Sequence, residues 1–188
     1  LLFFNFKLQG CNMKQPSHQL ADSTYAQLRE QSRAQAVSKM PLRLQESVKL
    51  EDITGRTIAQ LSRWDTHPNR RVMWSWPQWT SRYAAIYPKR FELAIWFHSM
   101  LCSASLGRPT WGAGKLRLDM IESSPEKTPL TGNTAQLTVI AAEAYAISIG
   151  AQQVRIMNPI NNKVRSHYES LGYLYVGGKS DFCTKDLI

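Results

Sequence analysis

The alternation of apolar and polar residues along the chain predicts a succession of helices and strands. Residues 17–39 read as a polar helix with only a thin apolar stripe. Such a helix is typical of an appendage or a partner-binding arm rather than a core element. Residues 42–46 then alternate apolar and polar, as a first strand does, and from Leu50 to Trp64 the apolar residues recur at helical spacing.

The rest of the chain alternates strand and helix patterns more clearly. Trp79, Tyr83 and Tyr87 share one face of a helix, and residues 91–109 read as two strands or one long bent strand. Residues 115–123 form a further strand, in which we expect the even-numbered positions from Leu116 to Glu122 to face one way. A loop, a long helix, a short strand, a second helix and a terminal hairpin follow, over residues 125–133, 134–149, 153–157, 161–170 and 173–188. This order predicts an α/β or α+β fold, with helices packed on a sheet.

Composition changes this picture little, because 188 residues with 43% hydrophobic content suit one domain with an extension. We assign residues 1–40 to an N-terminal extension that carries the polar helix, and residues 41–188 to the main domain. Since the chain begins with Leu, Met13 or Met40 is a candidate natural start. No apolar run is long enough to cross a membrane. Three separated cysteines predict neither a disulfide framework nor a metal site, which favours a reducing, cytoplasmic compartment.

The net charge of +9 lies mainly in the first half of the chain. Residues 1–90 hold 14 Lys and Arg against 6 Asp and Glu, whereas residues 91–188 hold 9 against 8. A basic half attracts polyanions such as nucleic acid, a phosphorylated cofactor or an acidic partner. Because the charges are scattered, a solvated surface is the simpler interpretation, and nucleic acid is not the leading expectation.

A glycine-containing loop before the long helix is a candidate anion site. The loop PEKTPLTGN ends where that helix begins, and the start of a helix leaves backbone N–H groups unpaired. Together with the helix dipole, such groups suit a pyrophosphate. Gly132, Asn133, Thr134 and Ala135 would supply them. The same arrangement also serves as a plain connection in many α/β proteins, so it is weak evidence by itself.

A second motif, NPINNKVRSHYESLGY, covers residues 158–173. A strand ends at Asn158, before a proline that cannot continue the pairing, so the sheet can splay open there. Tyr168 follows Asn161 by seven residues and therefore lies two turns along the same helix face. The helix stops at Gly172, which an aromatic residue follows.

This motif resembles the closing signature of the GCN5-related N-acetyltransferase (GNAT) superfamily. The matching positions are Asn161, Val164, Tyr168 and Leu171-Gly172-Tyr173, and the order of elements matches over roughly residues 42–187. The resemblance implies a mixed, twisted central sheet with helices on both faces and a splayed V between two parallel strands. It also implies direct transfer of acetyl from acetyl-coenzyme A to an amine, with no metal.

The resemblance also implies roles for particular residues. The backbone of Met120 and Ile121 would pair with the pantetheine arm, with Asn158 and Asn161 beside it, and the loop at Gly132 would hold the pyrophosphate. Tyr168 would give a proton to the leaving thiolate, a task that suits a phenol held on a helix. The alternative for Tyr168 is simple packing.

The pyrophosphate loop departs from the family's Gln/Arg-x-x-Gly-x-Gly/Ala pattern. It reads Pro-Leu-Thr-Gly-Asn-Thr over residues 129–134, so only Gly132 is retained. Thr134 is small enough to leave its N–H accessible, and Lys127 could supply the missing positive charge. The departure leaves two outcomes open, weaker coenzyme A binding or a degenerate relative.

The acceptor amine must lose a proton, and a carboxylate at a strand end is a suitable base, directly or through a water. Glu122 is the first choice, with Asp119 and Glu92 as alternatives. Trp74 and Trp76 are candidates for the acceptor pocket, since aromatic walls suit an amine through stacking or cation–π contacts.

A second hypothesis keeps the same fold without catalysis. The basic and aromatic segment RRVMWSWPQWTSRYAAIYPKR could then bind nucleic acid or a protein, with its rings stacking on bases. The polar helix over residues 17–39 could also pair with a second copy, which makes a homodimer a possible partner state. The sequence leaves the acceptor amine unidentified.

Overall fold

In the computed structural model, which describes residues 16–187, seven strands form one mixed sheet in the order β1-β2-β3-β4-β5-β7-β6. Only the β4–β5 pair is parallel among these strands. The strands are β1 Val48–Glu51, β2 Phe91–Phe97, β3 Met100–Pro109, β4 Lys115–Ser123, β5 Gln153–Met157, β6 Leu174–Val176 and β7 Phe182–Asp186. Residues 91–109 thus form a hairpin of two strands, which is one of the two structures that the sequence predicts for this segment. The expectations about Met13 and the first residues lie outside the described part.

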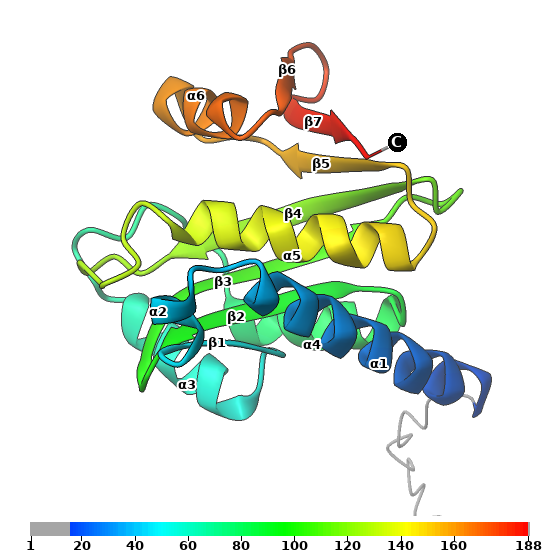
Figure 1. Ribbon diagram of the computed structural model, residues 1–188, viewed down its shortest axis with the longest axis horizontal. Coiled ribbons are helices and arrows are strands. Elements are labelled where there is room, and N and C mark those ends of the chain that lie inside the picture. Colours follow the sequence, from blue (N-terminus) through cyan, green and yellow to red (C-terminus); the bar gives the residue numbers. More distant parts are fainter. Residues whose placement is uncertain (1–15, 188) are drawn as a thin grey trace, which may run out of the picture.

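Helices cover both faces of this sheet, as expected. They are α1 Pro16–Ser38, α2 Leu42–Gln45, α3 Gly55–Trp64, α4 Trp76–Ile86, α5 Thr134–Ser148 and α6 Asn162–Ser170. α1 and α5 lie side by side over one face, whereas α4 lies behind the sheet, and α6 packs at the β6–β7 end (Figure 1). Each face has its own apolar core, with Leu93 and Tyr145 in one and Trp96 and Leu106 in the other. None of the helices in residues 16–187 combines the length and apolar character needed to cross a membrane.

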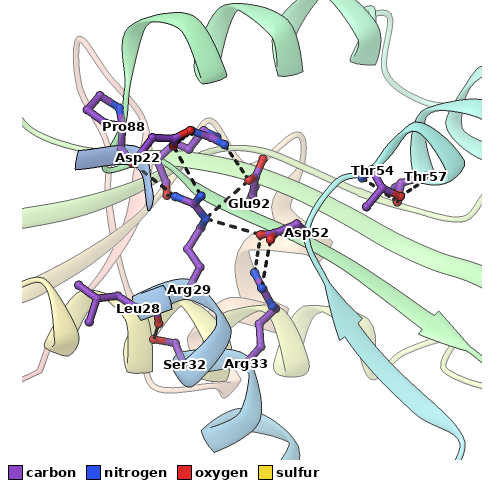
Figure 2. Close-up of polar contacts among 11 residues, drawn as sticks. Asp22, Leu28, Arg29, Ser32, Arg33, Asp52, Thr54, Thr57, Pro88 and Glu92 are labelled. Carbon is purple, nitrogen blue, oxygen red and sulfur yellow. Dashed lines mark hydrogen bonds and ion pairs between the residues drawn. The ribbon is translucent and has the colours of Figure 1, made fainter. Parts of the chain in front are cut away.

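α1 is part of the core, so its interpretation as an appendage is wrong. Ala36 is buried, and Arg29 is only 3% exposed. The Arg29 Nε lies 3.5 Å from Asp52 Oδ1 and 3.6 Å from Glu92 Oε1, and Arg33 donates to both Asp52 oxygens (Figure 2). The helix reads as polar because it packs partly through paired charges, which an apolar stripe does not record.

The first strand and the helix after it begin later than the pattern predicts. Residues 42–46 fall mostly in α2, a single helical turn that follows a proline, and pairing with β2 starts only at Val48. Leu50 lies in β1 rather than in a helix. The side chain of Thr54 accepts from the Thr57 N–H, and the Thr57 hydroxyl accepts from the Thr54 N–H. This capping box fixes the start of α3 at the residue after Thr54.

A bulge in β4 reverses which face of the sheet the side chains at the end of the strand point toward. Leu106 pairs with Met120 and Gly107 with Leu118, which leaves Asp119 without a partner on β3. Leu118 therefore packs in the core on the α5 side, and Met120 in the core on the α3–α4 side. The prediction of one continuous face is wrong because one extra residue reverses the alternation.

Candidate active site

The parallel strands β4 and β5 separate partway along their length. Their pairing ends at Leu118 and Ile156, although β4 continues to Ser123. A cavity of about 840 Å³ lies at this separation, which is a typical size for a small-molecule pocket. Its walls come from the end of β4, the α3–α4 loop, the start of α5 and one face of α6. The predicted V between two parallel strands is confirmed.

One wall is the start of α5, where the sequence predicts an anion site. Gly132 adopts a φ of +89°, in the left-handed region that favours glycine. Among residues 16–187, the N–H groups of Gly132, Thr134 and Ala135 have no acceptor, and all three residues line the cavity. The Asn133 N–H, by contrast, donates to the Leu130 carbonyl at 2.9 Å, so the prediction for Asn133 is wrong. Three amides remain for an anion.

The opposite wall is α6, whose geometry explains the predicted motif. The Asn161 side chain accepts from the Val164 N–H at 2.9 Å and so caps the helix start. At the other end Gly172 has a φ of +87°, and the Tyr173 N–H donates to the Tyr168 carbonyl at 3.1 Å. This is the hydrogen-bond pattern of a glycine C-cap.

Tyr168 lies where the motif places it, on the cavity wall, and is only 5% exposed. Its hydroxyl has no hydrogen-bond partner anywhere in the described residues. Burial raises the pKa of this phenol above its ordinary value, so Tyr168 stays protonated at neutral pH. The hydroxyl is therefore free to donate a hydrogen bond to a group bound in the cavity.

A buried ion pair surrounds the predicted base. Glu122 lines the cavity and is 6% exposed. Arg70 donates to both of its oxygens, at 2.8 Å from Nε and 3.2 Å from the second guanidinium nitrogen. The indole N–H groups of Trp76 and Trp74 donate to Oε2 at 2.6 and 3.3 Å. The hydrogen bond to Glu122 is the main reason that the pKa of Arg70 is raised, so the Arg70 guanidinium remains charged.

Of the three candidate carboxylates, only Glu122 lines the cavity. Asp119 sits in the bulge and accepts from the Tyr83 hydroxyl at 2.7 Å, and Glu92 belongs to the α1 network. Trp74 and Trp76 hold Glu122 through their N–H groups and are not among the lining residues. These two tryptophans therefore do not form the predicted pocket wall, and they support Glu122 instead.

Of the other residues predicted to bind the cofactor, some line the cavity and others do not. Ile121 lines the cavity, whereas Met120 packs in the α3–α4 core. Asn158 lies outside the lining residues, and its N–H donates to the Asp181 carbonyl. Lys127 is exposed and also lies outside the cavity.

Sequence reasoning missed the cavity's cations. Arg70 and Arg71 come from the α3–α4 loop and Lys163 from the first turn of α6, and all three line the cavity. Arg71 and Lys163 have no ion-pair partner within residues 16–187. Nothing in the loop's local pattern marks Arg70, because its partner Glu122 lies 52 positions along the chain.

No protein-family model matches the sequence, and no curated protein matches it either. Solved structures do match. Ard1 from Thermoplasma volcanium aligns with a TM-score of 0.57 and 9% identity over 76% of this chain and 99% of that one. An aminoglycoside 6'-N-acetyltransferase from Enterococcus faecium aligns at 0.54 with 12% identity, over 74% and 97%.

Arabidopsis thaliana Naa50, solved in complex with the bisubstrate analogue CoA-Ac-MVNAL, aligns with a TM-score of 0.53 and 13% identity, over 74% of this chain and 99% of that one. At these identities the likeness concerns the fold. The order of strands, the separated parallel pair and these neighbours agree, and the chain has the fold of the GNAT superfamily.

Proposed function

We propose that this protein transfers an acetyl group from acetyl-coenzyme A to an amine. The observation that carries the proposal is the cavity between the separated ends of β4 and β5. It has free N–H groups at one wall and the protonated Tyr168 on the other. The complex of Naa50 with a CoA-containing bisubstrate analogue supports the same ligand class.

The residues present fit the charged end of coenzyme A. The free amides of Gly132, Thr134 and Ala135 would bind the pyrophosphate, as the start of a helix binds anions. Lys163, rather than Lys127, would supply the positive charge. The backbone of Ile121, beyond the last β4–β5 pair, would bind the amides of the pantetheine arm as an added strand does.

The chemistry needs one proton donor and one proton acceptor. As the amine nitrogen forms its bond to the acetyl carbon, the carbon–sulfur bond breaks, and Tyr168 gives its proton to the departing thiolate. Glu122 would take the proton from the amine. Because its oxygens already accept from Arg70, Trp74 and Trp76, we expect this transfer to pass through a water rather than by direct contact.

Calorimetry with acetyl-coenzyme A tests the proposal. We expect micromolar-range binding to the wild-type protein and at least about a tenfold loss in Gly132→Arg, whose side chain would enter the anion site. Gly178→Arg is the matched control, since Gly178 also has a positive φ and open space around it but lies outside the cavity. Absence of binding by the wild-type protein would refute the proposal.

The alternative of an inactive nucleic-acid binder has less support. Its stacking surface would come from the aromatic segment before β2, but Trp76 and Tyr83 are buried there. Trp74 and Trp79 pack edge-on against those two rings. A binder of single strands needs exposed rings, so the enzyme remains the better proposal.

A further inference from the structure

We infer that the preferred amine acceptor carries a negative charge of its own, and that Arg70 and Arg71 determine this preference. The inference rests on the proposed function, because it concerns the acceptor side of the same cavity. Three features of the described residues support it: a neutralised carboxylate, an unpaired arginine and the effect of both on the reacting amine.

The first feature is the neutralisation of Glu122. It is the only carboxylate among the described residues that line the cavity, and an acceptor with a second amino group would need it as a partner. Arg70 already occupies both of its oxygens, and its own side chain is 8% exposed. A second ammonium would therefore have to displace the Arg70 guanidinium from its buried contact with Glu122, which is costly.

The second feature is the unpaired positive charge that remains. Lys163 lies two residues after Asn161 on α6, on the wall assigned to the cofactor. Arg71 follows Arg70 directly in the α3–α4 loop, and it also lines the cavity. With coenzyme A phosphates served by the amides and Lys163, Arg71 is left for the acceptor. A carboxylate is the natural partner of a guanidinium.

The third feature is the effect of this charge on the reacting nitrogen. Nearby cations disfavour the ammonium form of a bound amine and so lower its pKa. The neutral amine is the nucleophile, so a positively charged acceptor site favours the reactive form. Such a site repels further positive charge, but an acceptor with a carboxylate still binds, because the carboxylate pairs with Arg71.

Three ligands of equal chain length test the inference: aminohexanoate, hexylamine and diaminohexane. Their binding is followed by NMR through the indole N–H signals of Trp74 and Trp76, which donate to Glu122. We expect aminohexanoate to bind at least about tenfold more tightly than diaminohexane, with hexylamine between them. Binding of none of the three, or tightest binding of diaminohexane, would overturn the inference.

Variants assign the preference to the two arginines. Arg71→Gln should remove most of the preference for aminohexanoate over hexylamine, whereas Arg63→Gln, which removes an exposed charge from α3 outside the cavity, should leave it unchanged. An unchanged preference in Arg71→Gln would overturn the inference.

Arg70→Met frees Glu122 and should move the preference toward diaminohexane, and Arg70→Lys should retain the wild-type order. If Arg70→Met does not fold, Arg71→Gln decides the question, since it leaves the Glu122 contacts intact. The NMR assay needs no acetyl-coenzyme A. A charge preference without acetyl transfer would therefore reject the proposed function alone, and transfer without a charge preference would reject this inference alone.

Discussion

Substituting Arg29 by Met tests whether α1 belongs to the folded core. Arg29 is 3% exposed and lies within 3.7 Å of Asp22, Asp52 and Glu92. It also donates to the Pro88 carbonyl at 3.4 Å (Figure 2). Removing one partner of a buried ion pair costs about 3–5 kcal/mol. Glu92 keeps a second partner, because a guanidinium nitrogen of Arg90 lies 3.0 Å from its Oε1. We therefore expect a loss at the lower end of this range, about 3 kcal/mol.

Urea unfolding followed by circular dichroism measures this loss by linear extrapolation. The midpoint of thermal unfolding should fall by about 6–12 °C in parallel. Arg63→Met, on an exposed position of α3, is the control and should stay within about 0.5 kcal/mol of wild type. A loss below about 1 kcal/mol in Arg29→Met would show that the paired charges do not hold α1 on the sheet.

Three further predictions concern the sheet and the cavity. Gly107→Ala should cost at least about 2 kcal/mol in urea unfolding, because its Cβ would lie 2.4 Å from the Arg117 carbonyl oxygen; wild-type stability would contradict the bulge geometry. Tyr168→Phe should lower kcat at least about tenfold with little change in acetyl-coenzyme A affinity. Since burial raises the pKa of Tyr168, the phenol stays protonated as pH rises, and wild-type kcat should show no loss of this donor up to about pH 10. Asn161→Ala should cost about 1 kcal/mol of stability by loss of the helix cap, and Asn161→Asp should retain it.

The motif at the end of the chain could be predicted because its physics is local. The Asn161 cap, the Tyr168 position and the Gly172 stop all depend on residues within one helix and its ends. The long apolar helix α5 could be predicted equally well. For the same reason, the sequence could indicate unpaired N–H groups in the loop before α5, although it did not reveal that Asn133 donates within its own turn.

The errors arose where distant segments meet. α1 is stabilised by charges on β2 and near β1, and no pattern within the helix indicates those partners. The bulge at Asp119 depends on how β3 and β4 pair, so strict alternation placed Met120 on the wrong face. Arg70 reaches Glu122 across the fold, which is why the place of Glu122 at the end of β4 could be predicted from the sequence but its partner could not.

The early end of the β4–β5 pairing has a consequence for the behaviour of the protein in solution. Most sheets confine their unpaired backbone groups to the outer strands, where short length, charge or bulges protect them from joining another chain. Here the last residues of β4, from Asp119 to Ser123, continue beyond the last pair with β5 and so form a strand edge inside the sheet. Any extended chain with regularly spaced amides can pair with that edge. Under the proposed function, the pantetheine arm would pair with this edge as a missing strand and so shield it from another chain.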